Sequence, residues 1–155
     1  LPIKENLLGI RHPIFLNNRN MFTYDRTPLS LAYMEEDEGE NYFMGSLNGG
    51  KTKEYLTLIH TLAKNTQKDL ENNIVALWHD ESHLNRYFYD HKNEVRILPI
   101  GYFDAERKKI IEKTKIILQD KGHYRFGGHL WLRGQTNKKL TKFEWQFDNL
   151  KNMIK

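Results

Sequence analysis

Residues 78–85 read WHDESHLN, and they place two carboxylates, two imidazoles and an indole within one short segment. The segment directly follows residues 74–77, an apolar run that predicts a buried strand. In α/β folds, binding and catalytic sites lie at the ends of such strands. Charged groups are rarely buried without a partner, so we expect a functional site here, at the edge of the core.

Asp80 and Glu81 are the candidates for acid, base or nucleophile chemistry. In an extended chain, adjacent side chains point to opposite sides, but a turn from strand to helix lets both face one pocket. One carboxylate can then act as a nucleophile or stabilise a cationic transition state, while its neighbour binds a hydroxyl. The alternative is a structural cluster that caps a helix and forms ion pairs.

His79 and His83 stand at i and i+4, a spacing at which two imidazoles on a helix can share a metal. Zinc proteases of that kind need His-Glu-x-x-His, whereas the carboxylate of Glu81 is third in this segment rather than second. That offset turns the carboxylate away from the metal-binding face, and no third ligand is evident. The sequence therefore predicts no metal site here.

Two glycine-rich segments are further candidates for ligand binding. Residues 44–50, MGSLNGG, would let a ligand approach a strand backbone closely, or would form a plain turn. Residues 121–139 predict a flexible basic loop whose cations suit a diphosphate. Its aromatic side chains could instead stack on nucleic-acid bases, although no recognised nucleic-acid motif accompanies them.

Periodicity indicates the elements around these segments. Thr52 could cap a helix over residues 53–69, and Ser82 could cap a second helix over residues 83–91. Strands are expected at residues 42–47 and ending at residues 97–99, and the acidic run 35–40 is expected to be a solvated loop. Asp104 could open a helix through residues 110–111, and residues 115–118 fit either a helix end or a strand. A last helix pairs apolar side chains that we expect in the core: Phe143, Phe147, Leu150 and Ile154.

Composition bounds the function class. The chain has 155 residues, 39% of them hydrophobic, which is enough for one domain with a genuine core. It has no cysteine, which excludes disulfides and thiolate metal sites and suits a reducing compartment. No apolar run approaches the length of about 18 residues that a membrane span needs. Residues 106–155 carry 13 Lys and Arg against 5 Asp and Glu, which indicates an anionic partner or a solvated lysine face.

Taken together, these segments resemble the family 6 retaining glycosyltransferases, which include the blood-group A and B transferases, α-1,3-galactosyltransferase and bacterial relatives. The resemblance covers about residues 11–104, and the segment 78–85 is its most specific part. It also runs, in order, through His12-Pro13-x-Phe15, Phe22-Thr23-Tyr24-Asp25-Arg26-x-Pro28, Asp37-Glu38-Gly39, Tyr42-Phe43-Met44-Gly45 and Gly49-Gly50. It implies an α/β, Rossmann-like glycosyltransferase type A fold, of which this chain is the C-terminal, acceptor-binding portion.

The resemblance also implies roles for individual residues. Glu81 matches the catalytic carboxylate opposite the anomeric carbon of the donor. His79 and Asp80 match residues that bind the donor sugar, and Met44, Gly45 and Ser46 fall where donor sugars are distinguished. His12, Thr23 and Trp78 match acceptor-binding positions. Lys121 and Arg133, with Arg125 as a rival, are expected to bind the diphosphate.

One departure from the family pattern concerns the donor half. Family members carry Asp-x-Asp, or Asn-x-Asn in metal-independent bacterial relatives, upstream of the His-Pro segment, and neither precedes His12 here. The chain is therefore expected to be the C-terminal part of a longer enzyme, with the N-terminal nucleotide-binding half as its partner. No cofactor is expected within this chain; Mn²⁺ is possible in the family, and metal independence is favoured. Composition favours a bacterial, cytoplasmic member over a Golgi one.

The expected reaction is α-1,3 transfer of GalNAc, or of Gal, from a UDP-sugar to a β-galactoside that carries fucose at its 2-position. Ser46 leaves room for an N-acetyl group, while Met44 resembles the galactose-preferring blood-group enzyme. Two rivals from other classes stay open. One is a glycan-binding fragment without turnover, and the other is a nucleic-acid-binding module suggested by the basic tail alone.

Overall fold

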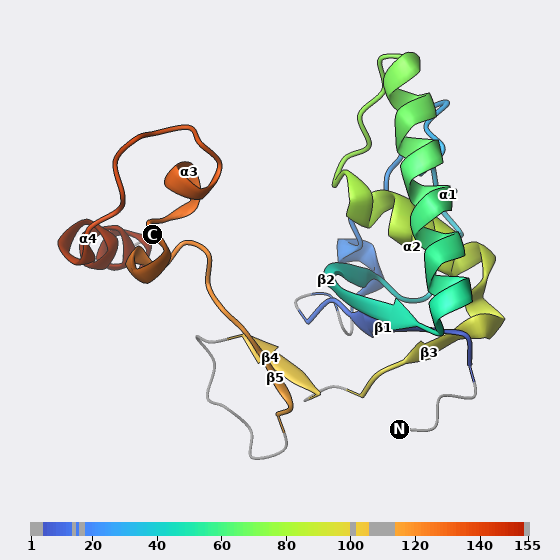
Figure 1. Ribbon diagram of the computed structural model, residues 1–155, viewed down its shortest axis with the longest axis horizontal. Coiled ribbons are helices and arrows are strands. Elements are labelled where there is room, and N and C mark those ends of the chain that lie inside the picture. Colours follow the sequence, from blue (N-terminus) through green and yellow to red (C-terminus); the bar gives the residue numbers. More distant parts are fainter. Residues whose placement is uncertain (1–4, 14, 16–17, 100–101, 106–113, 154–155) are drawn as a thin grey trace. The chain divides into compact units, whose positions relative to one another are not determined.

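The computed structural model describes residues 5–13, 15, 18–99, 102–105 and 114–153 (Figure 1). The chain forms two compact units, Leu1–Ile100 and Gly101–Lys155. The first unit combines a mixed sheet with two helices, in agreement with the predicted α/β class. The Rossmann-like type A arrangement stays a prediction.

The sheet of the first unit has the strand order β2-β1-β3. β1 (Leu7–Arg11) pairs antiparallel with β2 (Phe43–Gly50), with Leu7 opposite Gly50, and parallel with β3 (Val95–Ile97). The register between β1 and β2 shifts between Gly9 and Arg11. Gly9 is required there, because a Cβ at this position would lie 2.6 Å from a ring carbon of Phe88. β2 was predicted at residues 42–47, and the strand continues to residue 50 because it follows β1.

The helices α1 (Thr52–Glu71) and α2 (Asp80–Asp90) lie above this sheet in Figure 1. The main core joins both helices to β1 and β2 through five buried side chains: Leu7, Phe43, Leu58, Leu84 and Phe88. The predicted helix at residues 53–69 is confirmed as α1, but the predicted Thr52 cap is wrong, because Thr52 is the first helical residue and Lys51 is the N-cap. The short helices η1 (Arg19–Met21) and η2 (Lys92–Glu94) complete the unit.

α2 begins three residues earlier than predicted, so Asp80 and Glu81 lie in its first turn rather than before it. Negative side chains are favoured at a helix N-terminus, where the first N–H groups lack intrahelical partners. Ser82 is therefore not the cap. It lies inside the helix, and its Oγ accepts a hydrogen bond from the backbone N–H of Trp78 over 2.9 Å.

The buried strand predicted at residues 74–77 is wrong. Val75 and Leu77 are 58% and 52% exposed, and Ala76 alone of these four is fully buried. Backbone N–H groups of this segment form hydrogen bonds outside any sheet: the N–H of Ile74 donates to the carbonyl of Asp69, and that of Leu77 donates to the carboxylate of Asp25. The segment is therefore an irregular connection that leads into α2.

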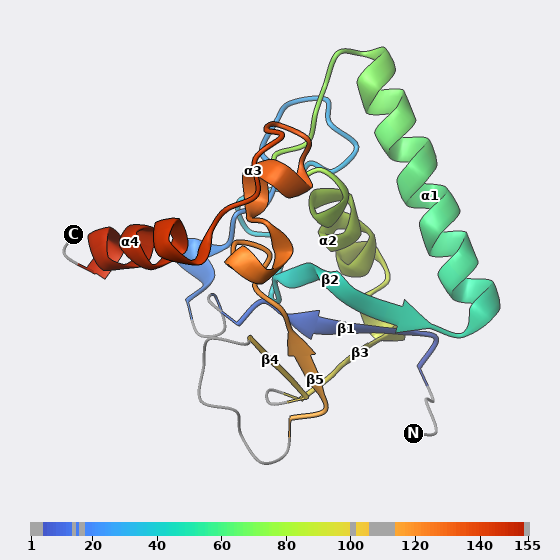
Figure 2. The ribbon, with the colours of Figure 1, turned by 60° about the vertical axis from the view of Figure 1, so that its left-hand side comes forward.

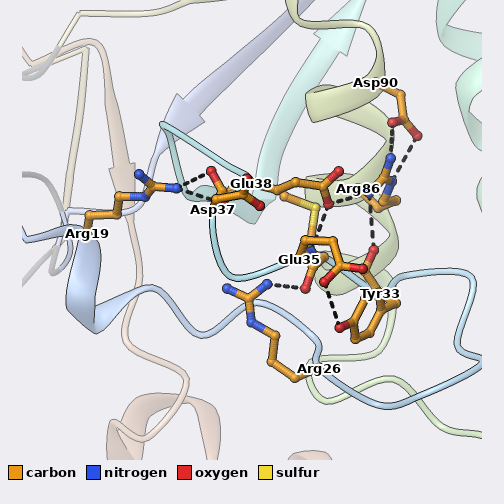
Figure 3. Close-up of polar contacts among 9 residues, drawn as sticks. Arg19, Arg26, Tyr33, Glu35, Asp37, Glu38, Arg86 and Asp90 are labelled. Carbon is orange, nitrogen blue, oxygen red and sulfur yellow. Dashed lines mark hydrogen bonds and ion pairs between the residues drawn. The ribbon is translucent and has the colours of Figure 1, made fainter.

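The acidic run 35–40 is an exposed loop, as predicted, but three arginines hold it in place (Figure 3). Arg19 donates to the carbonyls of Asp37 and Glu38, and Arg26 donates to the carbonyl of Met34. Arg86, on α2, forms ion pairs with Glu38 at 2.7 Å and with Asp90. These contacts fix the chain that enters β2.

The second unit, described by itself, contains a parallel pair formed by β4 (Phe103–Ala105) and β5 (Ile116–Leu118). Asp104 lies within β4, so it does not open a helix, and residues 110–111 of that predicted helix lie outside the described residues. The ambiguous residues 116–118 form a strand. The basic segment 121–139 contains η3 (Tyr124–Phe126) and α3 (His129–Leu132), visible in Figure 2, and its flexibility stays a prediction.

The predicted last helix is confirmed as α4 (Lys142–Met153). A capping box opens it, because the Glu144 carboxylate accepts the N–H of Thr141 while the Thr141 hydroxyl accepts the N–H of Glu144. Its expected core face is wrong for three of the four residues, which are largely exposed: Phe143 78%, Phe147 51% and Leu150 58%. The fourth, Ile154, lies outside the described residues. Apolar spacing identifies a helical face but does not show which element covers it.

Candidate functional site

The predicted site is built on a tight turn that connects Ala76 to the start of α2. The N–H of His79 donates to the carbonyl of Ala76, and the N–H of Glu81 donates to the carbonyl of Trp78 over 3.0 Å. His79 has φ 50° and ψ −121°, a backbone conformation that favours glycine. Such strain persists only where surrounding contacts impose it, and it is concentrated at functional sites.

Glu81 is held by both of its carboxylate oxygens. Oε1 accepts a hydrogen bond from the Tyr42 hydroxyl over 2.9 Å, and Oε2 accepts the backbone N–H of Gly45 over 2.7 Å. The carboxylate is thus oriented by Tyr42, directly before β2, and by Gly45 within it. A negative group fixed in this way can face a developing positive charge without reorganising.

Asn85, one helical turn after Glu81, binds α2 to β2. Its amide accepts the N–H of Phe43 and donates to the carbonyl of Phe43, each over 2.8 Å, and it also donates to the carbonyl of Glu81. The side chain is 2% exposed. Sequence reasoning missed this role, although a polar residue on the apolar face of a helix is a recognisable signal for a buried clamp.

Gly45 gives the two carboxylates room beside β2. A Cβ at this position would lie 3.2 Å from the Cβ of Glu81 and 3.6 Å from an oxygen of Asp80. Asp80 and Gly45 also line a depression of about 440 Å³ together with apolar side chains of α1. Met44 and Ser46 flank Gly45 in β2. Met44 is half-buried and Ser46 is exposed.

Three predicted acceptor-binding residues lie close to Glu81. The indole Nε1–H of Trp78 donates to the Thr23 hydroxyl over 2.9 Å, and Trp78 as a whole residue is 50% exposed. His12 stacks on Phe15 at 4.6 Å and meets the edge of Tyr42 at 6.0 Å. Burial lowers the pKa of His12, and the charge of Glu81 opposes this effect. The structure therefore brings His12 and Thr23, from two earlier segments of the chain, close to Trp78 and Glu81.

His83 belongs to a buried polar cluster and is separated from His79, which is exposed. Its Nε2 lies 3.6 Å from a carboxylate oxygen of Asp69, which also accepts the hydroxyl of Ser30. Burial lowers the pKa of His83, and Asp69 opposes the shift. Among the residues that the structure describes, no group of three or more His, Cys, Asp or Glu side chains could hold a metal ion.

The predicted diphosphate-binding residues lie in the second unit. Lys121 and Arg133 are both exposed, and Arg133 directly follows α3. The rival, Arg125, lies in η3 and is also exposed. A diphosphate-binding role for these side chains stays a proposal.

Comparison with known proteins places the chain among sugar transferases. A family model described as glycosyltransferase family 6 matches residues 3–126. Histo-blood group ABO system transferase 2 of Rattus norvegicus is 36% identical over 125 residues, which cover 78% of this chain and 37% of that protein. O-antigen biosynthesis glycosyltransferase WbnI of Escherichia coli is 30% identical over 129 residues, covering 83% and 54%. Globoside α-1,3-N-acetylgalactosaminyltransferase 1 of Gallus gallus is 34% identical over 105 residues, covering 67% and 31%.

The chain thus spans between 31% and 54% of the length of these curated relatives. Within the described residues, no helix is both long enough and apolar enough to cross a membrane.

Proposed function

The chain belongs to glycosyltransferase family 6, and from this premise we propose that it forms part of a retaining α-1,3-glycosyltransferase. The enzyme would move GalNAc, or Gal, from a UDP-sugar to O3 of a β-galactoside that carries fucose at its 2-position. The observation that carries the proposal is the Glu81 carboxylate, oriented by Tyr42 and by the backbone of Gly45.

Glu81 would act on the face of the donor sugar opposite the departing UDP. Retention of configuration needs a carboxylate that attacks the anomeric carbon or stabilises a short-lived oxocarbenium ion. With both oxygens already held, this carboxylate is ordered before the donor arrives, which avoids reorganisation during the reaction. The leaving diphosphate accumulates negative charge, and Lys121 and Arg133 would neutralise it.

His79 and Asp80 would hold the donor sugar, with Gly45 giving it close access to the backbone. The absence of a side chain at Gly45 supports this role, because any Cβ there would press on the Glu81 side chain. Met44 and Ser46 would distinguish N-acetylgalactosamine from galactose. We favour UDP-GalNAc, because Ser46 is small and a matched relative is itself named as an α-1,3-N-acetylgalactosaminyltransferase.

His12, Thr23 and Trp78 would bind the acceptor. Trp78 is 50% exposed and its indole N–H donates to Thr23, so the ring can pack on a sugar face in a fixed orientation. We further propose a bacterial, cytoplasmic setting; the match to an O-antigen biosynthesis glycosyltransferase of Escherichia coli supports its bacterial part. We also propose that the nucleotide-binding half of the enzyme completes the donor site.

The test is UDP release by the full-length parent protein from UDP-GalNAc and UDP-Gal in parallel. Each donor is assayed with 2′-fucosyllactose, with lactose and without acceptor, and with or without EDTA. We expect release from one donor that rises with 2′-fucosyllactose and falls by orders of magnitude in Glu81→Gln, with donor binding nearly intact. Release that is unchanged in Glu81→Gln would remove this carboxylate from the chemistry. Silence in every reaction would favour a glycan-binding fragment without turnover.

A further inference from the structure

We propose that Tyr42 is a positioning residue for Glu81, and that its hydroxyl ties the carboxylate to the acceptor side of the site. The inference rests on the proposed function, in which Glu81 faces the donor sugar. The observation behind it is a continuous chain of hydrogen bonds that runs from Trp78 to Glu81 through two hydroxyl groups.

The chain has three links. Trp78 Nε1–H donates to the Thr23 hydroxyl over 2.9 Å, and that hydroxyl donates to the Tyr42 oxygen over 3.1 Å. The Tyr42 hydroxyl then donates to Glu81 Oε1 over 2.9 Å. An indole N–H can only donate and an ionised carboxylate can only accept, so the direction of every link is fixed. All the hydroxyl hydrogens point toward the negative charge.

Within the part of the chain that the structure describes, the Tyr42 hydroxyl has one competing acceptor, and the geometry favours the carboxylate. The backbone carbonyl of Thr23 lies 3.5 Å from the Tyr42 oxygen, whereas Glu81 Oε1 lies 2.9 Å away. Hydrogen bonds to an ionised acceptor are shorter and about twice as strong as neutral ones. The hydroxyl therefore serves Glu81 rather than the backbone.

The ring of Tyr42 is held so tightly that its hydroxyl position is set by packing. The residue is 2% exposed, and its centroid lies 5.1 Å from that of Phe15, 5.3 Å from that of Tyr24 and 5.9 Å from that of Phe22. Burial raises the pKa of Tyr42 well above its usual range. The hydroxyl thus stays protonated near neutral pH and can donate to the carboxylate there.

The mechanical consequence concerns the rotation of the carboxylate. Among the described residues, the N–H of Gly45 is the one other hydrogen-bond donor to the Glu81 carboxylate, so without the Tyr42 hydroxyl Oε1 would lose its partner. The same chain of hydroxyl groups connects the carboxylate to Thr23 and Trp78. A group that binds at Thr23 therefore alters the hydrogen bond that the Thr23 hydroxyl donates to the Tyr42 oxygen. Acceptor contact and carboxylate orientation are thereby coupled in one network.

The primary test compares Tyr42→Phe with Tyr24→Phe in the full-length parent protein. Tyr24 is a matched control because it lies in the same aromatic cluster, is 5% exposed, and donates its hydroxyl to the carbonyl of Asn41 rather than to Glu81. UDP release is measured from UDP-GalNAc and from UDP-Gal, each with 2′-fucosyllactose and without acceptor. We expect kcat to fall about ten-fold or more in Tyr42→Phe, with the donor KM within about two-fold. Tyr24→Phe should keep kcat within about two-fold.

A double-mutant cycle on stability tests the contact without relying on turnover. Urea midpoints are measured for Tyr42→Phe, Glu81→Gln and the double variant, and for the same cycle with Tyr24→Phe. We expect the losses of Tyr42→Phe and Glu81→Gln to be non-additive, and those of Tyr24→Phe and Glu81→Gln to add.

The two tests separate the inference from the function on which it rests. If Glu81→Gln abolishes UDP release while Tyr42→Phe turns over like the parent, the positioning role is overturned and the proposed function stands. If the parent releases no UDP from either donor, the proposed function fails, and the cycle alone decides whether Tyr42 holds Glu81. Additive losses of Tyr42→Phe and Glu81→Gln would overturn the contact itself.

Discussion

Replacing Asn85 with alanine should destabilise the first unit and loosen Glu81 at the same time. The amide satisfies both backbone polar groups of Phe43, which are buried, and it also reaches the carbonyl of Glu81. The Glu81 carbonyl keeps its hydrogen bond within the helix, so losing the Asn85 amide at this carbonyl costs little. Each of the two Phe43 groups left without a partner costs about 1–3 kcal/mol. The expected loss is therefore about 4 kcal/mol of the free energy of unfolding.

The assay is urea unfolding followed by circular dichroism. For a slope of about 2 kcal/mol per molar urea, a loss of this size lowers the midpoint by about 2 M. Asn72→Ala is the control, because the Asn72 amide is exposed and donates to the carbonyl of Lys68 at the end of α1. Its cost should stay below about 0.5 kcal/mol.

Asn85→Asp sharpens the test because it keeps the size of the side chain. An aspartate still accepts the N–H of Phe43, but its second oxygen faces two carbonyls. The folded state would therefore raise the pKa of the new carboxyl above its unfolded value of about 3.9. The variant should be closest to the parent below about pH 4 and lose stability as pH rises. A loss under about 1 kcal/mol in Asn85→Ala, or no pH trend in Asn85→Asp, would refute the clamp.

Two further predictions concern the strained turn and the buried imidazole. His79→Gly should raise the free energy of unfolding by about 1 kcal/mol, because relief of the positive φ outweighs the extra chain entropy of glycine, while UDP release falls. Leu29 also has a positive φ, 68°, and is 88% exposed, so Leu29→Gly is the control: it should stabilise the protein by a similar amount and leave UDP release unchanged. A His79→Gly variant with a lower free energy of unfolding than the parent would show that the turn is not strained. His83 has its pKa lowered by burial, so the unfolded state binds its proton more readily. Urea unfolding should thus show stability lost as pH falls below about 6.5, and His83→Gln should flatten that slope; an equal slope in both proteins would contradict it.

The sequence by itself determined the family, the helix α1 and the position of the reactive segment. The long apolar stripe of α1 is a local pattern with helical period, so it can be found without knowing any contact. The cluster of ionisable groups in residues 78–85 is equally local, and the family model that matches residues 3–126 confirms the resemblance read from it.

Tertiary structure alone decided the conformation of residues 74–77 and the face of α4. The apolar residues 74–77 match the pattern of a buried strand, but two of their backbone N–H groups donate hydrogen bonds to Asp69 and Asp25 instead of to a neighbouring strand. Asp25 lies 52 residues from Leu77 along the chain. In α4, the spacing of Phe143 and Phe147 correctly predicts a helix with both side chains on one face. The prediction that this face is buried is wrong. Hydrophobic periodicity reports which side chains share a face, whereas burial depends on what packs there.

The site shows the same division. Glu81 can be recognised in the sequence because a second carboxylate, two imidazoles and an indole lie within a few residues of it. Tyr42 and Asn85 cannot be recognised in this way, since a tyrosine before a strand and an asparagine in a helix are common, and their contacts span 39 and 42 residues. Hydrogen bonds between distant side chains and backbone groups leave no periodic trace in a sequence. Only the folded chain shows that Tyr42 donates to the Glu81 carboxylate and that Asn85 connects the helix of Glu81 to β2.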